Sequence, residues 1–166
     1  MNNNAANRLD LMMSELNEQN ADCYKFRTLE EEDYNRGYFE LLSQLTVANK
    51  PEFDDWSKRF NQINSIGLTK IFVIEDLKEN KVIASITCSI ELKFIRNLGS
   101  ICHIEDFVID SLHRNKKLGS KLLNLGIEYA KTVSCYKVLL DTRDEVVPFY
   151  EKSGFKKTSN GMTIYL

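Results

Sequence analysis

The spacing of apolar residues along the chain changes near residue 70. Before that point, two segments carry apolar side chains every three to four positions, which is the period of an amphipathic helix. The first spans residues 30–47, and its apolar face holds Tyr34, Tyr38, Leu41, Leu42 and Leu45. The second follows Pro51, a residue suited to a first helical turn, and holds Phe53, Trp56, Phe60 and Ile63. We therefore predict two helices, the second ending near Gly67, with a short strand at residues 24–29 before them.

After residue 70 the pattern becomes that of strands. Residues 71–75 and 82–95 are rich in β-branched side chains, and the polar stretch 76–80 between them predicts an antiparallel hairpin. Residues 101–109 continue the sheet after a turn at 97–100. Helical spacing then returns in Leu118, Leu122, Leu125, Tyr129 and Val133. A short strand at 138–140, a short helix at 146–152 and a last strand at 162–165 complete the prediction.

This order of elements predicts an α+β fold, with helices packed on a mixed, largely antiparallel sheet. At 166 residues, the chain has the length of one domain, which we place at residues 22–166. Residues 1–21 are rich in asparagine, although Leu9, Leu11, Met12, Met13 and Leu16 could form one short amphipathic helix. We expect this segment to be a weakly ordered N-terminal extension.

Composition narrows the choice of partners. The chain has 22 basic and 24 acidic side chains, so no nucleic-acid or membrane partner is expected, and an anionic substrate needs a local basic cluster. No apolar run reaches the length of a membrane span and no signal peptide is evident, which predicts an intracellular, cytoplasmic protein. The four cysteines are widely spaced and predict reduced thiols, and the two histidines are too isolated for a zinc centre, so we expect no metal.

Two stretches carry candidate chemistry. A predicted strand, residues 104–110, leads into Arg114-Asn115-Lys116-Lys117-Leu118-Gly119 and then into a helix. Unpaired backbone amides at a helix N-terminus favour an anion such as a pyrophosphate, and two lysines add positive charge, although a basic loop before a helix is more often only solvated. The second stretch, after a short strand, is Val146-Val147-Pro148-Phe149-Tyr150-Glu151-Lys152-Ser153-Gly154-Phe155.

The order and separation of these two stretches resemble the GNAT superfamily of acetyltransferases. Four further stretches resemble the eukaryotic glucosamine 6-phosphate N-acetyltransferases: Asn35-Arg36-Gly37-Tyr38-Phe39 with Gln44-Leu45-Thr46, Glu91-Leu92-Lys93-Phe94-Ile95, His103-Ile104-Glu105-Asp106, and Cys135-Tyr136-Lys137 followed by Asp141. The resemblance implies a GNAT fold, acetyl-CoA as co-substrate, and direct acetyl transfer to the amine of glucosamine 6-phosphate for UDP-N-acetylglucosamine biosynthesis. It also implies a homodimer whose active site borrows residues from the partner chain.

The resemblance also implies a role for each site residue. Tyr150 would donate a proton to the departing sulfur, while Asp141 and Glu105 would orient the amine and take its proton, directly or through water. Acetyl-CoA would contact Tyr150 and the residues Asp106, Phe107, Val108, Ile109, Arg114, Asn115, Lys116, Lys117, Leu118 and Gly119. Glucosamine 6-phosphate would contact Asp141, Glu105 and the residues Thr46, Lys93, Phe94, Ile95 and Arg96, with its phosphate group against Lys93, Arg96 and Thr46.

Three departures from the family pattern keep alternatives open. Asn115 and Lys117 stand where glycine is common, and Val146 replaces a usual asparagine. Tyr165 stands where the family carries a phosphate-binding arginine, which favours a GNAT enzyme acting on another amine, such as a peptide N-terminus or a polyamine. A third reading is a non-catalytic acyl-CoA-binding module. The joint presence of Tyr150, Asp141 and Glu105 speaks against this third reading.

Overall fold

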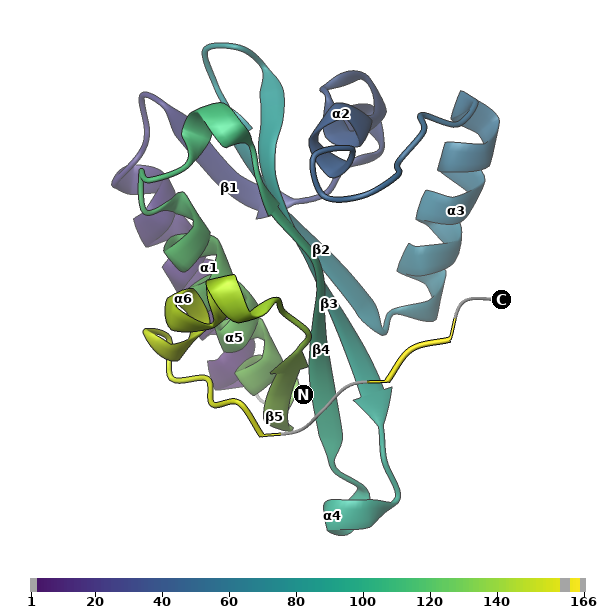
Figure 1. The fold of residues 1–166 in the computed structure, drawn as a ribbon, viewed down its shortest axis with the longest axis vertical. Helices are drawn as coiled ribbons and strands as arrows, with labels where there is room; N and C mark the ends of the chain where they lie inside the picture. The colour runs from purple at the N-terminus through teal and green to yellow at the C-terminus, as the bar shows by residue number, and fades with distance from the viewer. Residues whose placement is uncertain (1–2, 159–161, 165–166) are drawn as a thin grey trace.

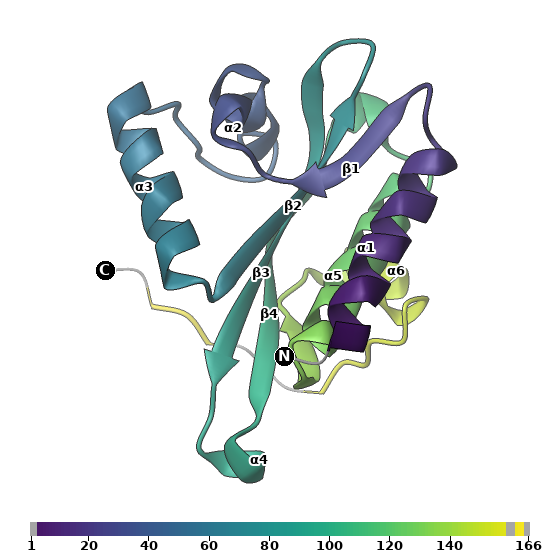
Figure 2. The ribbon, with the colours of Figure 1, turned by 180° about the vertical axis from the view of Figure 1, so that it is seen from behind.

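The computed structural model of the protein describes residues 3–158 and 162–164. A five-stranded sheet lies at its centre, with helices on both faces (Figures 1 and 2). The strands are β1 (Tyr24–Thr28), β2 (Thr69–Asp76), β3 (Lys81–Leu92), β4 (Ser100–Ile109) and β5 (Cys135–Leu140). The α-helices are α1 (Asn3–Glu18), α2 (Tyr38–Leu42), α3 (Phe53–Ile66), α4 (Ile95–Leu98), α5 (Leu118–Thr132) and α6 (Val147–Glu151). Three short 3₁₀ helices are η1 (Glu31–Asn35), η2 (Ser111–His113) and η3 (Asp144–Val146).

The strands lie in the order β1-β2-β3-β4-β5, antiparallel from β1 to β4, with β5 parallel to β4. Helices α1, α5 and α6 lie on one side of the sheet, and α2 and α3 lie on the other (Figure 1). The α+β class, the largely antiparallel mixed sheet and the β2–β3 hairpin predicted from the sequence are confirmed.

Apolar side chains fill both faces of the sheet. On β2, Phe72 and Ile74 join the core under α5, while Val73, between them, joins the core under α2 and α3. Successive side chains of a strand point to opposite faces, so a strand covered on both faces needs an unbroken apolar run. The second core also contains Trp56 of α3, which is 7% exposed.

The N-terminal segment differs from the expected weakly ordered extension. Residues of α1 pack along α5 (Figure 2), and Leu16 is 7% exposed within the main core. The Asn17 side chain pairs with the backbone of Phe26 in edge strand β1, donating at 3.1 Å and accepting at 2.7 Å. The segment docks because the helical spacing of its apolar residues gives α1 one apolar stripe, formed by Leu9, Met12, Met13 and Leu16. That residues 22–166 form the folded domain by themselves stays a prediction.

Two other predicted elements differ. The single helix expected at residues 30–47 is instead η1 followed by α2, because Gly37 between them takes a left-handed φ of 77°. The strand expected at 162–165 is not formed by the described residues 162–164, and Tyr165 lies outside the described residues. Within the part of the chain that the structure describes, no helix has the length and apolar character needed to cross a membrane.

Candidate active site

The central feature of the site is the point where β4 and β5 separate. The two strands pair from Ser100 to Ile104, which lies opposite Leu140, the last residue of β5. Strand β4 continues to Ile109, and beyond Ile104 no strand among the described residues pairs with its β5-facing edge. The register between β3 and β4 also shifts opposite Asp106, whose φ is +46°. Such a bulge bends its strand, and beyond Ile104 residues 105–109 of β4 have no strand partner on the β5 side within residues 3–158 and 162–164; we call this separation of the strands the opening.

The side chains of this segment serve mainly to pack. Val108 is 5% exposed in the core beneath α2, and the ring of Phe107 stacks on that of Phe149 with centroids 6.0 Å apart. Glu105 and Asp106 are exposed. A ligand in the opening would therefore meet backbone amides and carbonyls of residues 107–109, and two exposed carboxylates.

The residues from Arg114 to Gly119, which we call the 114–119 loop, connect η2 to the first turn of α5. Asn115 and Lys117 take left-handed φ values of 64° and 61°, at the two positions where the sequence lacks the common glycines. Lys117 caps α5 without a side-chain hydrogen bond, so the first amides of this helix remain available to an anion. These residues fit a pyrophosphate, and neither departure from glycine prevents the conformation.

The loop and the β4 edge meet at Gly119. A Cβ atom added there would lie 3.4 Å from Ile109 Cγ1 and 3.5 Å from Phe149 Cζ, so α5, β4 and α6 approach closely at this point. Leu118, 2% exposed, is a core side chain, so only its backbone can serve a ligand. The structure thus brings together the two stretches predicted to bind acetyl-CoA, residues 106–109 and 114–119.

Tyr150 lies on α6 at the same opening. It is 9% exposed, and its ring packs on Phe107, Phe149 and Phe155 at 6.3, 5.1 and 5.9 Å between centroids. Burial raises the pKa of its hydroxyl, an effect partly offset by the side chain of Thr142. The group therefore keeps its proton at neutral pH and can act as a hydrogen-bond or proton donor.

The two predicted catalytic carboxylates, Glu105 and Asp141, lie where β4 and β5 separate. Glu105 directly follows Ile104 and Asp141 directly follows Leu140, and Ile104 and Leu140 are partners in the parallel pair. The two residues therefore occupy the same level of the sheet, where the strands begin to separate. Both are exposed, so a substrate amine can reach them.

The predicted substrate-binding residues 93–96 lie elsewhere. Residues 93–96 belong to the turn between β3 and β4, at the end of the molecule marked α4 (Figure 1). Five strand positions separate Ser100 from Glu105, about 17 Å at the usual rise. Lys93 is ion-paired with Glu91, which also contacts His103 Nε2 at 2.9 Å. The fold does not bring Lys93, Phe94, Ile95 and Arg96 to the carboxylates of their own chain.

This turn exposes large apolar side chains, at fractions of 66%, 94%, 65% and 73% for Leu92, Phe94, Ile95 and Leu98. We call these four residues the hairpin tip. Arg96 within it has a left-handed φ of 56°. A cluster of exposed apolar residues of this kind is typical of an interaction surface.

Sequence reasoning missed a polar chain beside the 114–119 loop. Gln44, two residues before the predicted substrate residue Thr46, donates from Nε2 to Asp110 Oδ2 at 2.7 Å and accepts at Oε1 from the backbone amide of Ser111 at 2.9 Å. His113 contacts Asp110 and Asp76. No local pattern could reveal these pairs, because Gln44 and Asp110 are 66 positions apart. Among the described residues, no group of three or more His, Cys, Asp or Glu side chains could hold a metal ion.

The separation of β4 and β5, the 114–119 loop at the start of α5 and Tyr150 of α6 lie together at one end of the β4–β5 pair. Residues 26–155 match the acetyltransferase (GNAT) family, and the chain belongs to that family.

Several relatives share one name. The chain is 40% identical over 146 residues to the glucosamine 6-phosphate N-acetyltransferase of Arabidopsis thaliana, a match that covers 87% of this chain and 98% of that protein. It is 38% identical to glucosamine 6-phosphate N-acetyltransferase 1 of Dictyostelium discoideum, over 87% of this chain and 92% of that protein. The crystal structure of the Arabidopsis thaliana enzyme superposes with a TM-score of 0.84 at 41% identity, covering 86% of this chain and 97% of that one.

Proposed function

We propose that this protein transfers the acetyl group of acetyl-CoA to the amine of glucosamine 6-phosphate, giving N-acetylglucosamine 6-phosphate. The observation that carries the proposal is the convergence of the β4–β5 opening, the 114–119 loop and Tyr150 in a chain whose relatives carry that name. The product would feed UDP-N-acetylglucosamine formation in the cytoplasm.

Binding of acetyl-CoA falls to the backbone. The amides at the start of α5, with Arg114, Asn115, Lys116 and Lys117 around them, hold the pyrophosphate. The free edge of β4 from residue 106 to residue 109 holds the pantetheine arm, and its amides polarise the thioester carbonyl. The thioester supplies the activated acetyl group.

The side chains at the opening manage protons. Acetyl transfer needs a neutral amine and a proton for the departing thiolate. Asp141 and Glu105, level with each other where the strands separate, orient the amine and accept its proton, directly or through water. Tyr150 donates a proton to sulfur, a role supported by its buried, protonated hydroxyl beside the opening.

The position of the hairpin tip supports a homodimer. Its apolar side chains would be covered by a second protomer, and Lys93 and Arg96 would then reach the sugar phosphate in the partner's opening, since they cannot reach that of their own chain. Thr46 would contact the same substrate from the segment after α2. Association would also explain why Phe94, 94% exposed, is placed at the surface.

The test is a thiol-release assay with acetyl-CoA and a panel of amines. We expect glucosamine 6-phosphate to be preferred over glucosamine, a peptide N-terminus and a polyamine. Arg96→Ala should raise the KM for glucosamine 6-phosphate about ten- to a hundred-fold and that for glucosamine little, since it removes a charged hydrogen bond to phosphate. Equal use of the two sugars by the unmodified enzyme would contradict the proposal.

That outcome would favour a GNAT enzyme for another amine, the alternative supported by Tyr165 at the position of the family arginine. Sedimentation velocity on Phe94→Asp tests the dimer separately. We expect this variant to be monomeric and to lose activity on glucosamine 6-phosphate. A monomer with full activity would contradict a shared site.

A further inference from the structure

His113 is a buried histidine, 8% exposed, that lies between two carboxylates at one end of the sheet. Its Nδ1 atom is 3.0 Å from Asp110 Oδ1, and its Nε2 atom is 3.2 Å from Asp76 Oδ2. Asp110 follows the last residue of β4, and Asp76 ends β2. The imidazole therefore bridges two strand ends, and the next residue in the chain, Arg114, begins the 114–119 loop.

Both carboxylates are themselves fixed. Asp76 Oδ1 accepts the backbone amides of Lys78 at 2.8 Å and Glu79 at 3.1 Å. Asp110 accepts the amide of Leu112 at 2.9 Å and the side chain of Gln44 at 2.7 Å. Burial alone would raise the pKa of both carboxyls, but these hydrogen bonds together with His113 outweigh it and lower both. His113 thus faces two negative charges at neutral pH.

An aromatic neighbour of the imidazole also contacts the loop. The ring of Tyr24 in β1 meets that of His113 edge-on, with centroids 6.1 Å apart. The Tyr24 hydroxyl accepts a hydrogen bond from Lys116 Nζ at 3.2 Å. His113 therefore contacts Asp76, Asp110 and Tyr24, and Lys116 contacts Tyr24 in turn.

We propose that His113 is the positioning residue of the 114–119 loop. Its two hydrogen bonds hold the start of the loop against the ends of β2 and β4, so that Asn115 and Lys117 keep their left-handed backbone and present amides to the pyrophosphate of CoA. Each contact joins a ring nitrogen to a carboxylate oxygen, so the ends of β2 and β4 together restrain the orientation of the ring. The inference rests on the proposed function only in taking the loop as the CoA site, and it does not depend on the identity of the amine.

The energetic logic is preorganisation. Left-handed backbone at a lysine is unfavourable, so a loop released from His113 would spend less time in the binding conformation. The observed affinity is proportional to the fraction of time that the loop spends in the binding conformation. A loop that holds this conformation a tenth of the time therefore binds about ten-fold more weakly. His113 does not touch the reacting atoms, so turnover at saturation should be unaffected.

The experiment compares the full chain with His113→Gln by calorimetric titration with CoA and by steady-state kinetics. We expect the Kd for CoA and the KM for acetyl-CoA to rise about ten-fold, with kcat and the KM for the amine within about two-fold.

The matched control is His103→Gln, which alters the only other histidine of the chain. His103 also contacts a carboxylate, Glu91 at 2.9 Å, but lies on β4 on the hairpin-tip side, and its replacement should leave CoA affinity unchanged. Should His113→Gln not fold, Asp76→Ala removes the contact with Nε2 and should raise the Kd for CoA a few-fold with kcat preserved.

A folded His113→Gln or Asp76→Ala variant with unaltered CoA affinity overturns the proposal, even if its melting temperature falls, because the histidine then serves stability alone. A chain that binds CoA normally and weakens on His113→Gln, but does not acetylate glucosamine 6-phosphate, contradicts the proposed function and leaves the positioning role intact.

Discussion

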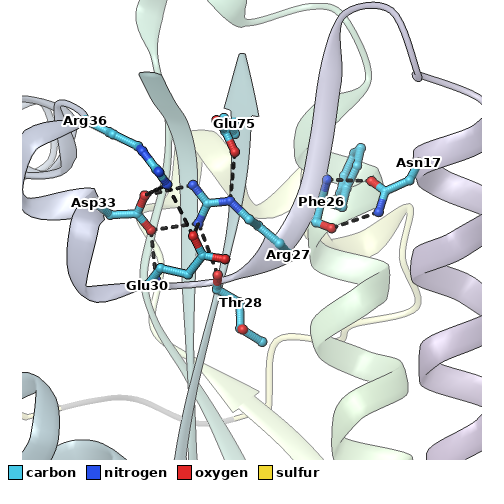
Figure 3. A network of polar contacts seen from close by, with 8 residues as sticks. All are labelled: Asn17, Phe26, Arg27, Thr28, Glu30, Asp33, Arg36 and Glu75. Carbon is cyan, nitrogen blue, oxygen red and sulfur yellow. Dashed lines mark hydrogen bonds and ion pairs between the residues drawn. The ribbon is translucent and has the colours of Figure 1, made fainter. Parts of the chain in front are cut away.

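The ion pairs of Arg27 in β1 allow a test of what holds η1 against the sheet. Its guanidinium donates to both carboxylate oxygens of Asp33 at 2.7 Å, and its Nε donates to Glu75 at 2.8 Å (Figure 3). Asp33 is fully buried in η1. Burial lowers the pKa of Arg27, but the bonds to the two carboxylates outweigh it, so the pKa is raised and the charge is retained.

Replacing Arg27 by methionine keeps most of its volume but strands the buried charge of Asp33. Removing one partner of a buried ion pair costs about 3–5 kcal/mol of unfolding free energy. Asp33 would keep the backbone amide of Glu30 at 2.9 Å and a longer contact with Arg36 at 3.4 Å. We therefore expect about 3 kcal/mol, the lower end of that range and a large share of the usual stability of about 5–15 kcal/mol.

Urea unfolding followed by tryptophan fluorescence can measure this loss. Trp56 is the only tryptophan of the chain, and its indole donates to the carbonyl of Glu31 at 2.9 Å, so it reports on η1 itself. Arg36→Met is the matched control, since Arg36 contacts the same carboxylate but its side chain is 26% exposed, and it should cost about 1 kcal/mol or less. Equal losses in the two variants would refute the reasoning, and adding Asp33→Asn to Arg27→Met should restore part of the loss.

Two further outcomes are expected. Tyr150→Phe should lower kcat about 10²- to 10⁴-fold with CoA affinity nearly unchanged, because the hydroxyl acts when charge develops on sulfur. Since burial raises the pKa of Tyr150, the proton is held across neutral pH, and an unaltered rate in an assay limited by chemistry would remove the residue from the mechanism. Leu16→Ala should destabilise the fold by about 2–5 kcal/mol in urea unfolding because it leaves a cavity in the core, whereas Leu11→Ala, 59% exposed on the same helix, should cost far less. Equal effects of these two variants would mean that α1 does not dock as described.

Periodicity predicted the parts of the fold whose neighbours are close in sequence. The β2–β3 hairpin, α3 with Gly67 at its end, and α5 were all predicted because strand and helix periods were unambiguous there. The break at Gly37 was missed because the apolar pattern runs through it, and only the positive φ of that glycine separates η1 from α2. The docking of α1 was missed because its partner, α5, lies about a hundred residues later.

For the candidate site too, the parts that are contiguous in sequence could be predicted, and those that depend on the fold could not. The 114–119 loop could be located because its strand, basic turn and helix are contiguous in sequence, and the family was recognisable from the FYEKSGF stretch. The distance of Lys93 and Arg96 from the carboxylates could not be read from sequence, since it depends on the length and direction of β4. The roles of Tyr150, Asp141 and Glu105 stay predictions.

The pairing of α1 with α5 has a consequence for how the protein is made. Leu118, the first residue of α5, follows Glu18, the last residue of α1, by 100 positions. At a synthesis rate of about 5–20 residues per second, the apolar stripe of α1 would leave the ribosome roughly 5–20 s before the start of α5 does. The β2–β3 hairpin and β4 emerge within that interval and can pair locally. A nascent chain stalled before residue 118 should therefore display Met12 and Leu16 as a binding site for chaperones, and that site should close once α5 is complete.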